Sequence, residues 1–529
     1  MLRVKNVGLR FGSRILFENV NAEFTDGNCY GVIGANGAGK STFLKILMGV
    51  QETTSGEVTH DKHDRISTLK QNHNIYDEYT VLETVIMGND KLYKIMKEKE
   101  ALYMKPDFSV EDGLLAGKLE ADFEAMNGWN AENDAAILLR GLMVDPDLYD
   151  KKMSEIKEKD KVKVLLASAL FGEPDILLLD EPTNGLDLKS KLWLEEFLIN
   201  FKGTIILVSH DRHFLNTVCT HMVDIDRERI RISIGNYDFW YKSNELMQKQ
   251  IKDSNKKKEE KIKELENFIA RFSANASKSK QATSRKKLLE KISLEELKPS
   301  SRKYPYINFE YEKRLGKEVI SLSKVNVLKD EKPIIKNLNL TINKDDKIAL
   351  VGENEIAKTS LFNVLSGNAL PDSGDVKVGS TVIISYFPKN HDEYFKSTEN
   401  LLEFLRSYSD NKDDSYVRGF LGRMLFSGEE SLKSLNVLSG GERVRIMFSK
   451  MMLNKGNVLL LDEPTNHLDM ESITALNDAL AKFDGPIIFS SIDTCLAESV
   501  ANRCIFIKND GSYVDKQMGY EEFSEKYDI

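Results

Sequence analysis

The segment that begins at Gly34 has the residue types and the spacing of a phosphate-binding loop. It reads GANGAGKST, a Gly-x4-Gly-Lys-Ser pattern that follows an apolar run and precedes an apolar-periodic segment. That context is the one a P-loop requires. Glycines let backbone N–H groups converge on phosphate oxygens, Lys40 adds a positive charge at the outer phosphates, and Ser41 can ligate Mg²⁺. The expected nucleotide-binding residues here are Gly34, Ala35, Asn36, Gly37, Ala38, Gly39, Lys40, Ser41 and Thr42.

Five side chains elsewhere in the first half could complete a hydrolytic site. Asp180 ends an apolar run and suits Mg²⁺, and the adjacent Glu181 can polarise an attacking water. His210 follows another apolar run, as expected of a residue that reaches the γ-phosphate; Gln71 fits a metal- or water-sensing role, and Phe11 can stack on adenine. The competing interpretations are a strand-end acid pair, a surface histidine, a polar loop residue and a core phenylalanine. The expected catalytic residues are Lys40, Glu181 and His210, and the expected Mg²⁺ ligands are Ser41, Gln71 and Asp180.

The chain contains this arrangement twice. Gly34 aligns with Gly352 at an offset of 318, whereas the sequence LLLDEPTN recurs at an offset of 282. The first half therefore carries 36 additional residues between Gln71 and Ile156. The segment 90–129 is the natural location, because it is charge-rich and has the apolar spacing of helices. We expect a helical arm there.

Each half is predicted to be an α/β domain with a mostly parallel sheet. The runs Cys29–Ile33, Ile176–Leu179 and Ile205–Val208 are short and apolar, as buried parallel strands are. Because such runs alternate with helical segments, the sequence predicts βαβ units. The expected division is a first domain at 1–245 with the arm at about 90–129, a linker at 246–303, and a second domain at 304–529.

The composition and the cysteine pattern argue against several classes of protein. The 529 residues carry 74 Lys+Arg and 83 Asp+Glu, and hydrophobic residues make up 41%. The four cysteines include no CxxC pair, which argues against a structural zinc site and a disulfide framework. No signal peptide and no apolar run of about 18 residues is apparent. We expect a soluble cytoplasmic protein made of folded domains.

The segment between the halves differs in charge from the rest of the chain. Residues 246–303 hold 17 Lys/Arg against 8 Asp/Glu, and Phe268–Leu288 holds six cations and no anion. Its flanks have helical spacing around a small polar centre, which predicts a helical hairpin. A cationic tip on an acidic protein favours local contact with a polyanion, whereas the competing interpretation is an ordinary solvated face. The candidate RNA contacts are Arg271, Lys278, Lys280, Arg285, Lys286 and Lys287.

Taken together, these motifs resemble the ATP-binding cassette superfamily. The segment LSGGER at 438–443 looks like its signature loop, and the twin cassettes, the arm and the basic linker are similar to the ABC-F class and its YbiT/YkpA branch. The resemblance implies an ATPase that uses ATP and Mg²⁺, and a monomer whose two cassettes pair head to tail. Each ATP would then lie between the P-loop of one half and the signature of the other. The signature residues implied for the first P-loop are Ser439, Gly440, Gly441 and Glu442.

On this arrangement the two composite sites differ. Site one, which pairs the first P-loop with the second signature, has every expected piece. In site two, Glu355 and Ala357 stand in place of P-loop glycines, and the opposing signature reads IKEKD at 156–160. Phe11, Gln71 and His210 are matched there by Lys329, Lys389 and Ile492. We expect one hydrolytic and one degenerate site, the latter retaining Gly352, Asn354, Lys358, Thr359, Ser360, Asp462 and Glu463.

The resemblance implies a translation factor. ATP would close the cassettes, the closed form would bind the ribosomal E site, and the linker would contact the P-site tRNA and large-subunit ribosomal RNA. Hydrolysis would then release the protein. The alternatives are the twin ATPase subunit of a membrane ABC transporter, a DNA-repair type of ATPase and a non-hydrolysing scaffold. The sequence leaves open a housekeeping role or antibiotic resistance by ribosome protection, and ATP or GTP as the nucleotide.

Overall fold

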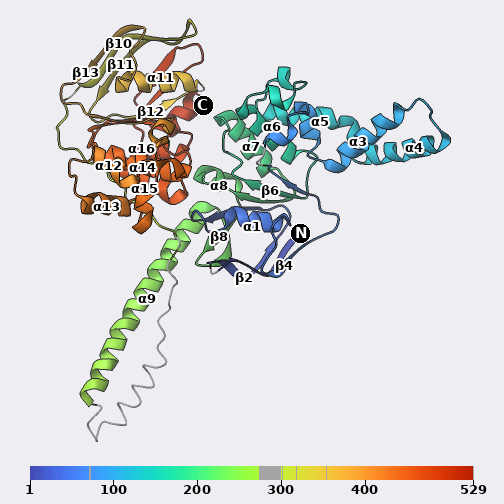
Figure 1. The fold of residues 1–529 in the computed structure, drawn as a ribbon, viewed down its shortest axis with the longest axis horizontal. Coiled ribbons are helices and arrows are strands. Elements are labelled where there is room, and N and C mark those ends of the chain that lie inside the picture. The colour runs from blue at the N-terminus through green and yellow to red at the C-terminus, as the bar shows by residue number, and fades with distance from the viewer. Residues whose placement is uncertain are drawn as a thin grey trace.

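The computed structural model describes residues 1–12, 14–70, 73–272, 300, 302–316, 318–352 and 354–527. Two halves lie side by side, each built around a six-stranded and a three-stranded sheet, and a long helix projects away from the junction between them (Figure 1). Over the described ranges, no helix combines the length and the apolar character needed to cross a membrane.

The first half has its six-stranded sheet in the order β5-β6-β7-β3-β8-β9. Its strands from β5 to β8 run parallel and β9 runs antiparallel to β8, which confirms the parallel strands predicted from the apolar runs. An antiparallel sheet, β2-β1-β4, covers one side. The strands are β1 (Leu2–Phe11), β2 (Arg14–Phe24), β3 (Cys29–Gly34), β4 (Ser55–His60), β5 (Ile66–Thr68), β6 (Ile176–Asp180), β7 (Thr204–Val208), β8 (His221–Asp226) and β9 (Arg229–Ile234).

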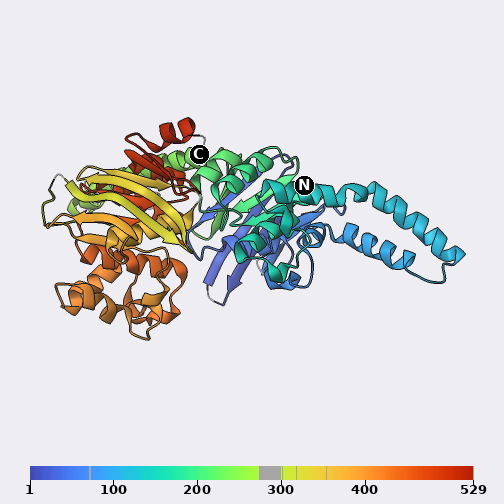
Figure 2. The same ribbon diagram turned by 90° about the horizontal axis from the view of Figure 1, so that it is seen from above.

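Helices surround this sheet and form a separate lobe. The pair α3 and α4 projects from the first half as a two-helix arm, which both views show (Figures 1 and 2). The helices are α1 (Lys40–Leu47), α2 (Val81–Ile86), α3 (Asp90–Tyr103), α4 (Val110–Ala125), α5 (Ala131–Gly141), α6 (Glu158–Leu170), α7 (Leu188–Ile199) and α8 (Arg212–Val218). The long helix that follows the first half is α9 (Tyr237–Phe272).

The second half repeats the design. Its sheets have the orders β14-β15-β16-β12-β17-β18 and β11-β10-β13. The strands are β10 (Glu318–Lys329), β11 (Lys332–Asn343), β12 (Lys347–Val351), β13 (Ser373–Val378), β14 (Ile384–Phe387), β15 (Val458–Asp462), β16 (Ile487–Ser490), β17 (Arg503–Ile507) and β18 (Tyr513–Lys516). The helices are α11 (Glu355–Ser366), α12 (Leu401–Tyr408), α13 (Asp414–Arg423), α14 (Gly440–Leu453), α15 (Met470–Lys482), α16 (Thr494–Val500) and α17 (Tyr520–Tyr527).

Apolar packing holds each half together and reaches across the junction. Two buried clusters lie on the two faces of each six-stranded sheet, and successive apolar side chains of β6 and β15 point alternately into one cluster and the other. Met470, the first residue of α15, is 5% exposed and packs into the core of the first half. The start of α15 is therefore held against the first half.

Candidate functional site

The first P-loop is an open turn between β3 and α1. Every residue of β3 is buried, and α1 begins only at Lys40, so Ala35 to Gly39 stay outside regular structure. Gly37 and Gly39 have φ values of 77° and 103°, a left-handed region that favours glycine. The Lys40 ammonium donates a 2.8 Å hydrogen bond to the carbonyl of Gly34. The loop is thus shaped to receive an anion at the start of a helix.

Three acid–base side chains lie at the ends of neighbouring strands beside this loop. Asp180 is the last residue of β6, and Glu181 follows it with its backbone N–H bonded to the carbonyl of Val208 on β7. The backbone N–H of His210 donates to Glu181 Oε2 at 3.3 Å, and His210 Nε2 lies 3.5 Å from Glu181 Oε1. Parallel pairing of β6 and β7 therefore brings the predicted acids and the predicted histidine together.

A cleft of about 420 Å³ opens in front of these residues. Its lining combines hydroxyl, carboxylate and apolar groups: Ser41, Leu69, Lys70, Val162, Leu165, Asp180, Glu181 and Asn184. Phe11, at the end of β1, has 53% of its surface exposed, so its ring is not the core residue that the competing interpretation supposed. Gln71 lies outside the described residues.

The electrostatics of the cleft hold its acid and its base in their neutral forms. Burial, reinforced by the charge of Asp180, raises the pKa of Glu181 to about 8. Burial and the charge of Lys40 lower the pKa of His210 to about 4. Among the described residues, Glu181 Oε1 and His210 Nδ1 have no hydrogen-bond partner. Oxygen donors beside unpartnered buried atoms fit a divalent cation of the Mg²⁺ type and its water.

Charged residues of the second half also influence the pKa of Lys40. Burial lowers the pKa of Lys40, and the charges that oppose this shift are Glu181, Glu471, Asp469 and Asp180. Asp469 caps the N-terminus of α15, and Glu471 is the second residue of that helix. Sequence reasoning missed Asp469 and Glu471. The repeated motif DEPTNxLD, which ends at Asp469, was the available signal.

The second signature forms a capped helix start. Ser439 accepts a hydrogen bond from the backbone of Glu442, whose carboxylate accepts in return from Ser439 at 2.9 Å. A Cβ at Gly440 would lie 3.3 Å from His467, so this loop packs against its own half. Within the described ranges, no hydrogen bond or ion pair joins residues 439–442 to residues 34–42. The contact of the second half with site one is made through the start of α15 instead.

Site two has lost its open loop. Helix α11 begins at Glu355, three residues before Lys358, which is the counterpart of Lys40. The residues that match Gly37–Gly39 are therefore helical. Asn354 caps this helix, since its side chain accepts the N–H of Ala357 at 3.0 Å, and the N–H of Lys358 bonds to the carbonyl of Asn354. Two of the backbone N–H groups that would face a phosphate, those of Ala357 and Lys358, therefore already have acceptors.

The polar side chains of site two bond to one another. The Thr359 hydroxyl donates to Asp462 at 2.7 Å, Lys358 lies 3.7 Å from Glu463, and Lys389 donates to Glu355 at 2.6 Å. Burial raises the pKa of Glu355, but the hydrogen bond from Lys389 and the charges of Lys389, Lys358 and Lys159 outweigh burial and lower it. The Glu355 carboxylate, which stands in place of a P-loop glycine, thus has a lysine partner within its own half.

The signature opposite site two also departs from its counterpart. Helix α6 begins at Glu158 after Lys157, which makes no side-chain cap bond, in contrast to the capping box at Ser439. Its Lys159 is close enough to influence the pKa of Glu355 in the other half. Lys159 of this helix and Lys389 of the second half therefore both act on the Glu355 carboxylate, which stands where site one has a glycine.

The predicted RNA contacts fall beyond what can be described. Arg271 lies in the last turn of α9 and its side chain is outside the described residues, as are Lys278, Lys280, Arg285, Lys286 and Lys287. Their positions remain a sequence-based prediction.

Family models and a known relative both match this chain to ABC transporter proteins. A family model described as ABC transporter matches residues 17–184 and 335–466, and a second model with that description matches residues 223–309. The chain is 57% identical to the ABC transporter ATP-binding protein YkpA of Bacillus subtilis (strain 168), over 100% of this chain and 98% of that protein. It is 44% identical to the probable ATP-binding protein YbiT of Escherichia coli O157:H7, over 99% of each.

Solved structures share the fold at lower identity. The archaeal ribosome recycling factor aABCE1, in complex with the ribosomal stalk protein aP1, matches with a TM-score of 0.62 and 17% identity, over 99% of this chain and 92% of that one. A model of ribosome-bound archaeal Pelota and ABCE1 matches with a TM-score of 0.58 and 17% identity, over 99% and 80%. At 17% identity, these two matches show that the fold is shared.

Replacing Glu181 by Gln should raise the melting temperature of the nucleotide-free protein, and more at pH 8 than at pH 5. Since folding raises the pKa of Glu181 to about 8, the folded state binds this proton more tightly than the unfolded state does. Wild-type protein therefore loses stability as the pH rises from the ordinary glutamate pKa towards 8. We expect a difference of about 2–4 °C by calorimetry. The exposed Glu52→Gln is the control, and equal or lower melting temperatures for Glu181→Gln at both pH values would contradict the assignment.

Proposed function

The chain belongs to the ABC transporter ATP-binding family, as a twin-cassette protein of ABC-F type, and on that premise we propose that it is a ribosome-associated ATPase with a single hydrolytic site. One observation carries the proposal. The P-loop of site one is open beside Glu181 and His210, whereas the matching loop of site two is folded into α11. The proposed cassettes are residues 1–245 and 304–529, joined by a linker at 246–303.

Hydrolysis at site one would use Ser41, Asp180 and Glu181, which line one cleft, together with residues near them. Ser41 and Asp180 would hold Mg²⁺, and bound Mg²⁺ would neutralise charge on the phosphate oxygens. Lys40 would exchange the Gly34 carbonyl for the outer phosphates. Glu181 in its ionised form, which the charge of Lys40 favours against burial, would orient the attacking water and accept its proton. His210, 3.5 Å from Glu181, would hold that water in line with the γ-phosphate. Phe11 would stack on the adenine.

Site two is proposed to lack turnover. Its counterpart of the catalytic acid, Glu463, is 3% exposed and paired with Lys358, and Asp462 accepts hydrogen bonds from Thr359 and Ser490. A nucleotide and its metal would have to break these bonds before binding. The retained residues Gly352, Asn354 and Ser360 therefore serve the fold of the second half in this proposal, and site two holds ATP weakly or not at all.

The partner proposed for the closed form is the ribosome. Support comes from the ABC-F type of the chain and from the cations of residues 268–288. The fold is also shared with an archaeal protein described as a ribosome recycling factor and with archaeal proteins described as ribosome-bound. In this proposal the linker contacts P-site tRNA and large-subunit ribosomal RNA, and hydrolysis releases the protein. The second candidate, the ATPase subunit of a membrane transporter, takes its support from the description of the matching family model.

Turnover should depend on one of the two equivalent acids. Glu181→Gln is expected to lower the ATPase rate by about 100-fold or more, because it removes the base that activates water. Glu463→Gln, the same change at the matching position, is expected to leave the rate within about twofold, since that carboxylate already pairs with Lys358. Phosphate release by the two purified variants measures this asymmetry, and equal loss of turnover in both would refute it.

Nucleotide binding should show the same asymmetry. Equilibrium binding of a fluorescent ATP analogue is expected to saturate near one molecule per chain, because in the described part of site two the N–H groups of Ala357 and Lys358 already have acceptors. Lys40→Ala should abolish this binding, and Lys358→Ala should leave it intact. Two sites of equal affinity, or binding that survives Lys40→Ala, would contradict a single competent pocket.

The linker cations should govern attachment to ribosomes. Replacing all six by Gln is expected to weaken ribosome co-sedimentation in ATP and to lower the salt dependence of log K by about 0.7–0.9 for each phosphate that the protein ceases to neutralise. A matched control replaces six exposed lysines of the two halves: Lys62, Lys332, Lys336, Lys377, Lys482 and Lys526. Equal effects of both sets would show that general charge governs binding, and co-sedimentation of wild-type protein with membranes instead of ribosomes would favour the transporter.

A further inference from the structure

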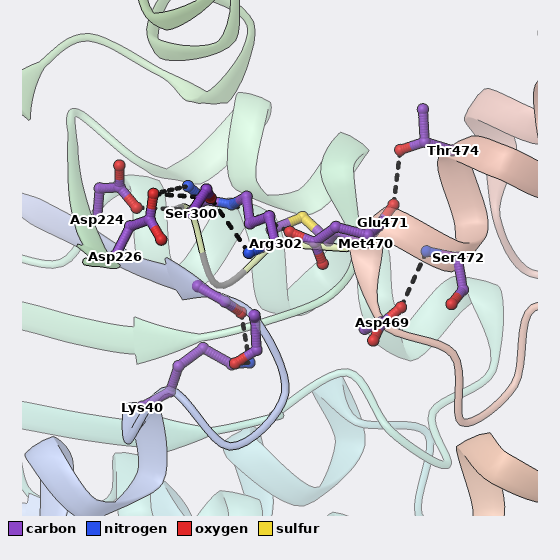
Figure 3. A network of polar contacts seen from close by, with 12 residues as sticks. Lys40, Asp224, Asp226, Ser300, Arg302, Asp469, Met470, Glu471, Ser472 and Thr474 are labelled. Atoms are coloured by element: carbon purple, nitrogen blue, oxygen red, sulfur yellow. Dashed lines mark hydrogen bonds and ion pairs between the residues drawn. The ribbon is translucent and has the colours of Figure 1, made fainter. Parts of the chain in front are cut away.

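One guanidinium group joins three parts of the molecule at the base of the linker. Arg302 lies where the chain returns from the linker to the second half. Its Nη2 donates to Asp224 on β8 at 2.7 Å, and its Nε lies 3.0 Å from Glu471 on α15. Its Cζ is 4.8 Å from the ring centroid of Trp240 on α9. Figure 3 shows Arg302 between Asp224 and Asp226 of the first half and Glu471 of the second half.

The surroundings of this contact make it specific to an arginine. The Arg302 side chain is 10% exposed, and those of Asp224 and Glu471 are 13% and 7% exposed. Ser300 adds a 2.9 Å hydrogen bond to Asp226. A planar guanidinium can bond to carboxylates on two sides at once, whereas the point charge of a lysine cannot.

Glu471 links this contact to site one. The charge of Glu471 is among those that oppose the lowering of the Lys40 pKa by burial. Burial in turn raises the pKa of Glu471, and the charges of Arg302 and Lys40 oppose that rise. The carbonyl of Met470 accepts a 3.2 Å hydrogen bond from Arg212, two residues after His210. The start of α15 is thus fixed to the first half by two arginines, one near the catalytic histidine and one at the linker base.

We propose that Arg302 is a positioning residue that couples the linker to ATP binding at site one. It pairs with the Glu471 carboxylate, so that this acid does not compete with phosphate for Lys40. When the linker moves, Arg302 moves with it and releases Glu471, which then competes with ATP for Lys40. This coupling rests on the proposed hydrolytic site.

The cavity beside Arg302 gives this movement room. It has a volume of about 180 Å³ and lies between α9, the returning chain and α15. Its walls include Tyr237, Trp240, Tyr304, Glu471 and Thr474. The returning segment and the base of α9 are therefore not tightly packed against each other.

A suppressor experiment on the full chain tests the coupling. Arg302→Gln should weaken binding of the fluorescent ATP analogue by about tenfold, because the freed Glu471 carboxylate attracts Lys40. The turnover number should stay within about twofold. Adding Glu471→Gln should restore the dissociation constant to within about twofold of wild type. A purely structural role for Arg302 predicts no such rescue, since the second change removes a further interaction between the halves.

Controls separate the possible outcomes. Arg3→Gln removes the Arg3–Glu23 ion pair of 3.4 Å, which joins β1 to β2 within the first half, and should leave ATP binding unchanged. If Arg302→Gln does not fold, Arg302→Lys with and without Glu471→Gln makes the same comparison. Wild-type affinity in Arg302→Gln, or no rescue by Glu471→Gln, would overturn the proposal.

Hydrogen exchange provides a readout at the linker itself. In a Glu181→Gln background, ATP should change the exchange of backbone amides at 237–248, the first turns of α9, and Arg302→Gln should abolish that change. An ATP response that persists in Arg302→Gln would overturn the coupling. ATP binding that does not require Lys40 would instead overturn the proposed function, so the two failures are distinguishable.

Discussion

Phosphate recognition at a helix start requires backbone N–H groups that no other acceptor has taken. The first half meets this requirement, because glycines with left-handed backbone angles keep the segment before Lys40 out of the helix. The second half does not, because Asn354 caps a helix that begins three residues earlier. A small change in residue type thus alters which groups satisfy the same donors. The two sites differ because their helices begin at different positions relative to the P-loop lysine, and the side-chain pairs of site two form beside the earlier helix start.

Each half supplies part of the electrostatic environment of the other. The start of α15 brings Asp469 and Glu471 to the neighbourhood of Lys40, and Lys159 of α6 acts on Glu355 across the junction. Asp469 and Glu471 are buried, and buried charges are tolerated only when they are paired, so the contact of these two acids with the first half fixes the relative position of the halves. The junction is therefore sensitive to any change in the charge of either pocket.

Much of the fold and of site one could be predicted from the sequence, because both depend on short-range patterns. The apolar run at Cys29–Ile33 and the glycine spacing after it define a strand and a loop without reference to distant residues. Site two was predicted to be altered, but its geometry could not be predicted, since the bond between Lys389 and Glu355 joins residues 34 positions apart. The place of Asn354 before helix-forming residues was a usable sign of an earlier helix start. The role of Arg302 had no local sign, because its partners lie on β8 and α15.

Helix α9 converts small rotations at its base into large displacements at its far end. With 36 residues it is about 54 Å long at 1.5 Å per residue. A tilt of about 5° at Trp240 would move the other end of the helix, about 48 Å away, by roughly 4 Å. Helix α9 is thus a lever whose pivot lies between the two halves. A small displacement at this pivot becomes a displacement of several ångströms at Phe272.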